Sequence, residues 1–165
     1  MMISLWLVPE TTAKAKLDNL IREMAKKHGT NGFDAHVSLL LAEVSDGEIE
    51  KKCKKIAEVV KGLRLELTEV SVSTTRHQCV FARVKTSTEL MKIYQETMRE
   101  CGMNLAERMY MPHLSLVYGE MDLETRVKTA ESVELPMNSF VVGELWVMGE
   151  EMGPDSWERV HRLTV

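Results

Sequence analysis

The sequence predicts an α+β fold with two lobes, each an antiparallel sheet with helices packed on its outside, and a cleft between the lobes. Short apolar strand candidates alternate with amphipathic helical stretches along all 165 residues. The order strand, helix, strand, helix, strand occurs twice, roughly in residues 1–72 and 73–165. The tripeptide His-x-Ser lies in the middle strand candidate of both halves, at positions 36–38 and 113–115.

The first half begins with a strand over residues 3–8, which Pro9 ends. Thr11 and Thr12 are suited to cap the helix that follows, and Gly29 breaks the chain before the first His-x-Ser strand. A second helix begins near Asp46 and ends at Gly62, and a strand with alternating leucines covers residues 63–67. The apolar stripes of the two helices are Leu17, Leu20, Ile21 and Met24, and Ile49, Cys53, Ile56 and Val60.

The second half repeats this order. A strand covers residues 79–85, and residues 86–88 are suited to cap a helix whose stripe contains Leu90, Met91, Tyr94 and Met98. Gly102 precedes the second His-x-Ser strand, residues 120–131 are helical, and strands cover residues 140–148 and 157–165. Tandem copies of one unit tend to pack about a pseudo-twofold axis, which would bring the two His-x-Ser strands together.

Size and charge limit the function classes. The chain suits a single domain over residues 1–165, and we expect a monomer. Its net charge of −4 and pI of about 5.8 argue against a membrane surface or an extended nucleic-acid surface, and so favour a small-molecule ligand. Three dispersed cysteines and the lack of a signal or membrane-spanning segment favour the cytoplasm.

The two His-x-Ser motifs suggest displacement at phosphorus. Residues i and i+2 of a strand share a face, so each motif places an imidazole beside a hydroxyl. With His36 and His113 facing each other, one neutral imidazole takes a proton from water and one imidazolium protonates the leaving oxygen. The hydroxyls of Ser38 and Ser115 would donate to phosphate oxygens. No carboxylate cluster accompanies both motifs, so we expect neither a metal nor another cofactor.

The motifs and their flanks resemble those of the two-histidine (2H) phosphoesterase superfamily, and more closely its cyclic phosphodiesterase branch in plants and fungi. The segments that carry this resemblance are residues 2–9, 35–39, 78–81 and 110–119, which follow the family order across nearly the whole chain. A single His-x-Ser is weak support, whereas two copies with these flanks are specific.

The resemblance implies a 2',3'-cyclic-nucleotide 3'-phosphodiesterase that converts nucleoside 2',3'-cyclic phosphates to 2'-phosphates. It also implies conversion of ADP-ribose 1'',2''-cyclic phosphate, a by-product of tRNA splicing, to ADP-ribose 1''-phosphate. His36 and His113 correspond to the catalytic pair, with His113 favoured as base and His36 as acid. Ser38 and Ser115 correspond to the phosphate ligands. Trp6 and Tyr118 match aromatic positions that border the cleft.

Several interpretations stay open at this point. Trp6 is suited equally to the core and to a stacking platform, and Tyr118 reaches the cleft only if its strand twists or ends there. His77 is left out of the predicted site. The same site would also suit an RNA end carrying a cyclic phosphate, as in ligase-like relatives, and a nucleotide-binding module without turnover is the alternative from another class.

Overall fold

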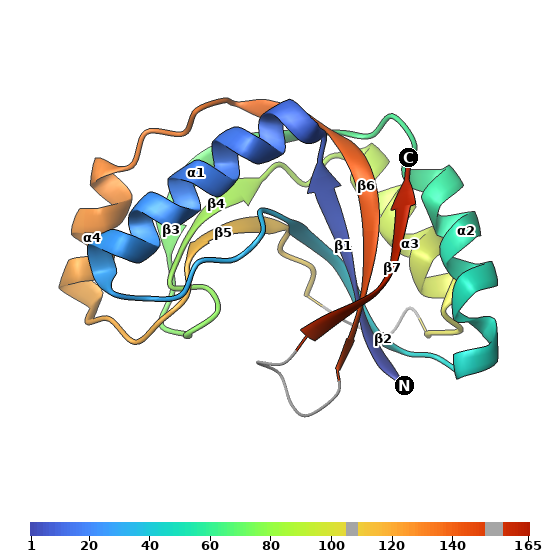
Figure 1. Cartoon of the computed structure of the whole chain (residues 1–165). Helices are drawn as coiled ribbons and strands as arrows, with labels where there is room; N and C mark the ends of the chain where they lie inside the picture. Colours follow the sequence, from blue (N-terminus) through green and yellow to red (C-terminus); the bar gives the residue numbers. More distant parts are fainter. Residues whose placement is uncertain (105–108, 151–156) are drawn as a thin grey trace.

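The computed structural model describes residues 1–104, 109–150 and 157–165 (Figure 1). Over these residues the chain forms four α-helices, one 3₁₀ turn and seven strands. In chain order they are β1 (Met2–Pro9), α1 (Thr11–His28), β2 (Val37–Glu43), η1 (Asp46–Glu48), α2 (Ile49–Val60), β3 (Arg64–Val72), β4 (Val80–Val84), α3 (Thr88–Glu100), β5 (His113–Val117), α4 (Leu123–Ser132), β6 (Ser139–Glu150) and β7 (Trp157–Thr164). The predicted α+β class and the predicted order of elements are confirmed.

The described strands form one antiparallel sheet of seven strands, in the order β1-β2-β5-β4-β3-β6-β7. Because β6 pairs with β3 near its start and with β1 and β7 further on, the sheet curves back on itself into the arch seen in Figure 1. The expected pair of separate sheets, one in each lobe, is therefore corrected to one continuous sheet. The long β6 and the contact between β2 and β5 provide the continuity.

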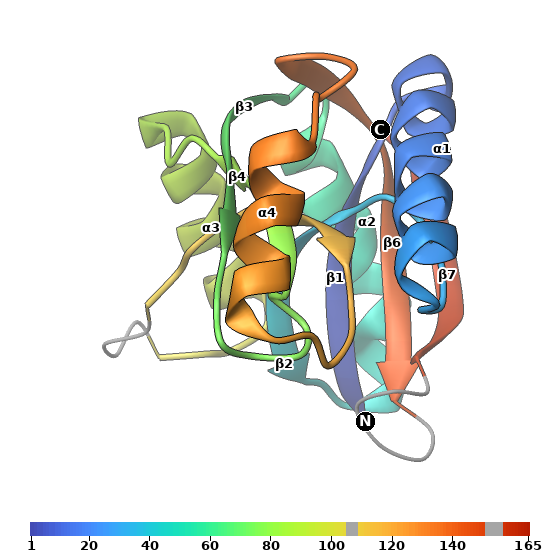
Figure 2. The same cartoon turned by 90° about the vertical axis from the view of Figure 1, so that its left-hand side faces the viewer.

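The strands of the two predicted halves pair in equivalent ways. β1 pairs with β2 and with β6, just as β4 pairs with β5 and with β3. The third strand of each half thus joins the strands of the other half. The helices also contact the other half, since α1 of the first half contacts β5 of the second, and α3 of the second half contacts β2 of the first. Figure 2 shows α4 across the β3 and β4 side of the arch, and α2 and α3 lie together at the opposite end in Figure 1.

Three helix starts differ from the prediction. α2, expected to begin near Asp46, begins at Ile49 after the 3₁₀ turn η1. Glu10 caps α1, because its carboxylate accepts hydrogen bonds from the backbone N–H groups of Thr12 and Ala13, so the expected threonine cap is wrong. Asp122 caps α4 in the same way, and this helix begins at Leu123, three residues later than expected. Ser87 caps α3 as predicted. Gly29 ends α1 with a left-handed φ of 65°, a conformation that costs glycine little.

The two faces of β1 separate core from cleft. Ile3, Leu5 and Leu7 are buried in the main hydrophobic core beneath the helices. Trp6, on the opposite face, packs in a small second cluster with Val8 and Trp146. Within the described residues, no helix combines the length and apolarity that crossing a membrane requires.

Candidate active site

The two His-x-Ser strands are neighbours in the sheet. β2 and β5 are joined through one register pair, Val37 with Leu114. In an antiparallel pair this register places His36 opposite Ser115 and Ser38 opposite His113, all on the face away from those two apolar residues. The structure thus brings the two predicted motifs to one seam of the sheet.

Each histidine is held by a carbonyl two residues before it. Nδ1 of His36 lies 2.7 Å from the carbonyl oxygen of Asp34, and Nδ1 of His113 lies 2.9 Å from that of Met111. A carbonyl only accepts hydrogen bonds, so both Nδ1 atoms carry the proton and donate it. Each neutral imidazole then has its lone pair on Nε2, which is the nitrogen left to exchange protons with a ligand.

Each histidine also contacts an aromatic ring from the neighbouring strand. Trp6 pairs in register with Ser38 and stacks on His36, with ring centroids 3.6 Å apart and planes 5° from parallel. Phe81 pairs with Ser115 and meets His113 edge-on at 5.3 Å. A register shift immediately precedes both aromatic residues, and such bulges redirect side chains. Trp6 therefore lies on the site face, and Phe81 is its counterpart that sequence reasoning did not single out.

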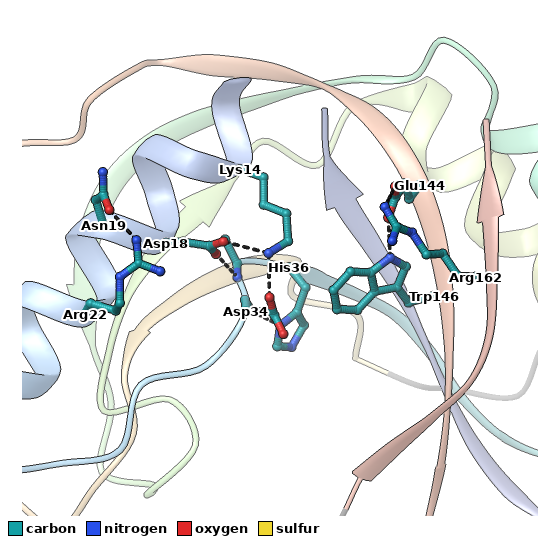
Figure 3. A network of polar contacts seen from close by, with 10 residues as sticks. Lys14, Asp18, Asn19, Arg22, Asp34, His36, Glu144, Trp146 and Arg162 are labelled. Atoms are coloured by element: carbon teal, nitrogen blue, oxygen red, sulfur yellow. Dashed lines mark hydrogen bonds and ion pairs between the residues drawn. The ribbon is translucent and has the colours of Figure 1, made fainter. Parts of the chain in front are cut away.

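Charged residues of α1 fix the segment in front of β2 (Figure 3). The carboxylate of Asp18 accepts a 2.8 Å hydrogen bond from the backbone N–H of Ala35. Lys14 bridges the carboxylates of Asp18 and Asp34. Because the Asp34 carbonyl accepts the proton of His36 Nδ1, this network sets the position and the tautomer of the imidazole.

Burial lowers the pKa of both histidines. His36 is 5% exposed, and desolvation lowers its pKa to about 4, with the charges of His113 and Lys14 acting in the same direction. Desolvation also lowers the pKa of the half-buried His113, and the neighbouring Arg83 adds to the effect. The hydrogen bonds to the carbonyls oppose these shifts without reversing them. Both imidazoles are therefore neutral at pH 7 in the unliganded protein.

The two serines differ in where their hydroxyls lie. Ser38 is exposed on the wall of a cleft of about 1150 Å³ that contains both histidines. Ser115 is buried, and its hydroxyl donates to the carbonyl of His77 at 3.1 Å, so the structure does not place it on the cleft wall. The symmetric pair of hydroxyls expected from the motif is thus asymmetric here.

Most aromatic residues of the chain lie on the cleft wall. Seven of the nine Phe, Tyr and Trp residues of the chain line it, although aromatic rings usually fill the core. They are Trp6, Phe33, Phe81, Tyr94, Tyr110, Tyr118 and Trp157. Tyr118 reaches the cleft because β5 ends at Val117, and its ring stacks on Phe33 at 3.9 Å. Phe33 directly follows Gly32 in the segment before β2, where no periodic pattern marked it.

His77 and Arg83 are further cleft residues outside the predicted set. His77 lies on the loop between β3 and β4 and meets Tyr118 edge-on. The buried Arg126 of α4 holds this loop by donating to the carbonyls of Ser73 and Thr75. A basic residue within a predicted strand could have suggested a candidate anion-binding residue from the sequence. Only the register with β5, however, shows that Arg83 lies opposite His113.

No group of three or more His, Cys, Asp or Glu side chains within the described ranges has a geometry suited to a metal ion. The described wall offers the neutral imidazoles of His36 and His113, the imidazole of His77, one guanidinium, several hydroxyls and several aromatic faces. Such a set can bind a phosphate, stack on a nucleobase and move protons.

Comparison with known proteins agrees with this geometry. The sequence model of a family described as cyclic phosphodiesterase-like protein matches residues 1–151. A cyclic phosphodiesterase of Arabidopsis thaliana is 25% identical over 141 residues, which cover 85% of this chain and 77% of that protein.

Solved structures share the fold at low sequence identity. The apo form of Escherichia coli LigT has a TM-score of 0.62 and 15% identity, with 99% of this chain and 96% of that chain covered. TT0787 of Thermus thermophilus has a TM-score of 0.62 and 12% identity, with coverages of 99% and 97%.

Proposed function

Because the chain belongs to the cyclic phosphodiesterase-like family of 2H phosphoesterases, we propose that it hydrolyses nucleoside 2',3'-cyclic phosphates to nucleoside 2'-phosphates without a metal. We extend the proposal to ADP-ribose 1'',2''-cyclic phosphate, with ADP-ribose 1''-phosphate as product. The observation that carries it is the matched pair of histidines on adjacent strands, each donating through Nδ1 to a carbonyl and so keeping Nε2 for the substrate.

The proposed reaction is one in-line displacement. Water attacks phosphorus as His113 Nε2 takes one of its protons, and the bond from phosphorus to O3' breaks as protonated His36 delivers a proton to that oxygen. The product keeps its phosphate on O2', and the two histidines exchange protonation states. Proton transfer through solvent restores them for the next turnover.

This assignment requires proton uptake when substrate binds. Burial lowers the pKa of His36 to about 4 in the free protein, so an acid form exists at pH 7 only after a bound anion raises that pKa. A phosphate between two imidazoles has this effect, because an adjacent negative charge favours the imidazolium. If His113 is the histidine that gains the proton, the two roles are exchanged and the chemistry is otherwise the same.

The cleft wall supports a nucleotide as ligand. Its aromatic side chains offer faces on which a base can stack, and the exposed Ser38 can donate to a phosphate oxygen. Ser115 reaches a phosphate only by exchanging its hydrogen bond to the His77 carbonyl for one to the ligand. Solved complexes of E. coli LigT with phosphate and with 3'-AMP support binding of such ligands in this fold.

The test is product analysis with 2',3'-cyclic AMP in EDTA. We expect 2'-AMP alone, with undiminished rate in the chelator. Release of 3'-AMP would contradict the regiochemistry, and loss of rate in EDTA would contradict the metal-free reaction. His36→Ala and His113→Ala should each lower kcat by roughly 10²- to 10⁴-fold, as expected for loss of a general acid or base. Binding without turnover in the wild type would identify a nucleotide-binding module instead.

A further inference from the structure

Arg83 is the one formally charged Lys, Arg, Asp or Glu side chain among the described residues of the cleft wall. It lies on β4, directly opposite His113 of β5. The other described wall residues are aromatic, aliphatic or neutral polar, apart from the histidines. Among the described residues of this cleft, an anionic substrate therefore meets Arg83 as the single permanent cation.

The guanidinium is held on the far side of His113 from His36. Along one row of the sheet, Ser38 of β2, His113 of β5 and Arg83 of β4 follow each other across the strands. In the proposed reaction the reacting phosphate binds at the seam of β2 and β5, because these two strands carry the two histidine motifs. Arg83 contacts Glu69 of β3, with Nε 3.1 Å from a carboxylate oxygen, and so leans away from that seam.

One donor nitrogen of the Arg83 guanidinium faces a weak acceptor. Nη1 lies 3.3 Å from the thioether sulfur of Met111, which is a poor acceptor. Nε is buried and makes no hydrogen bond with the described residues, although the Glu69 carboxylate balances its charge. A guanidinium has five N–H donors in a planar fork that matches phosphate oxygens. For Nη1, a phosphate oxygen is thus a stronger acceptor than the thioether of Met111.

We propose that Arg83 determines specificity by binding a second phosphate group, so that preferred substrates carry at least one phosphate besides the cyclic one. This inference rests on the proposed function and adds the substrate class to it. The volume of about 1150 Å³ exceeds the range of about 300–1,000 Å³ usual for small-molecule sites, which leaves room for the additional group.

The experiment compares two substrates that differ in one group, adenosine 2',3'-cyclic phosphate with and without a 5'-phosphate. In the wild type, kcat/KM should be higher for the 5'-phosphorylated substrate. Arg83→Gln should reduce the ratio of the two kcat/KM values roughly 10- to 100-fold, as expected for loss of a charge-assisted hydrogen-bond pair. Because any change in the basicity of His113 affects both substrates, the ratio isolates the second phosphate.

Two control variants sharpen the comparison. Arg83→Lys keeps the charge but loses the planar fork, and should give an intermediate ratio. Lys85→Gln removes the same charge just beyond the same strand, where Lys85 pairs with Glu66 outside the cleft, and should keep the wild-type ratio. An unchanged ratio in Arg83→Gln, or an equal fall in Lys85→Gln, overturns the inference.

Two more substrates identify the source of the second phosphate. ADP-ribose 1'',2''-cyclic phosphate carries it as a pyrophosphate, and a dinucleotide ending in a 2',3'-cyclic phosphate carries it as an internucleotide diester. The substrate whose kcat/KM falls most in Arg83→Gln identifies the kind of second phosphate that Arg83 binds.

A binding measurement separates failure of this inference from failure of the proposed function. If the wild type turns over none of these compounds, the proposed function fails. Calorimetry with adenosine 2'-phosphate and adenosine 2',5'-bisphosphate then tests Arg83 by itself. Tighter binding of the bisphosphate that is lost in Arg83→Gln supports the inference, and equal loss for both ligands overturns it.

Discussion

The burial of His36 should make the stability of the protein depend on pH in a way that one substitution removes. The pKa of this imidazole is about 4 in the folded protein and 6.5 in the unfolded chain. Between these values the unfolded chain binds a proton that the folded protein does not bind. The free energy of unfolding therefore falls as the pH falls from 6.5 towards 4.

The size of the effect follows from the two pKa values. At pH 5 the imidazole is protonated in about 97% of unfolded chains but in only about a tenth of folded ones. Integrated from pH 7 to pH 5, this difference costs about 2 kcal/mol of the free energy of unfolding. His36→Gln retains a polar side chain that does not titrate, so this variant should lose about 2 kcal/mol less than the wild type over the same interval.

Urea denaturation followed by circular dichroism at pH 7 and pH 5 measures both losses. Any general destabilisation by the substitution cancels, because each protein is compared with itself at two pH values. His113→Gln is the matched control, since it keeps His36 and the burial that is the main cause of its lowered pKa, and should keep most of the His36 contribution. Equal losses in the wild type and in His36→Gln would refute the conclusion that His36 is buried in its neutral form.

Two further predictions concern the bound state. In NMR spectra of the imidazoles at pH 7, His36 and His113 should both be neutral in the free protein, and one should be protonated when 2'-AMP is bound; two neutral rings in the complex would contradict acid catalysis by this pair. Ser38→Ala should lower kcat/KM by about tenfold or more, and Ser115→Ala by less, because the Ser115 hydroxyl gives up its bond to the His77 carbonyl to reach a ligand. Steady-state assays with 2',3'-cyclic AMP decide this order, and a larger loss in Ser115→Ala contradicts it.

Local pattern was sufficient to predict the elements and the motif strands. Strand alternation and helical stripes located each strand and helix to within a few residues, because burial on one face leaves a periodic trace. The two His-x-Ser motifs were recognisable because they repeat. No periodic pattern in the sequence indicates that β6 pairs with both β1 and β3, since this pairing depends on which strands the two ends of a long strand contact in the folded protein. The single curved sheet was therefore missed.

The rest of the candidate site depends on contacts between distant segments. Phe33, His77 and Arg83 lie in or beside loops and strands with no motif of their own, and only folding brings them to the cleft. Aligning the two halves could have identified Phe81, because it takes the place in β4 that Trp6 takes in β1, opposite the motif serine. Sequence reasoning used this repeat to pair the histidines but did not extend it to their neighbours.

The two histidines share their backbone contacts but differ in burial and in the aromatic rings around them, and these two facts have different consequences for catalysis. A carbonyl two residues upstream gives both imidazoles the same tautomer, and each ring contacts an aromatic side chain from the next strand. Acid–base catalysis, however, needs two groups whose protonation differs at one pH. Trp6 covers the face of His36, whereas Phe81 meets His113 only edge-on, and His113 is the less buried of the two. A repeated motif can thus supply the geometry of an acid–base pair, while residues outside the motif make its two members unequal.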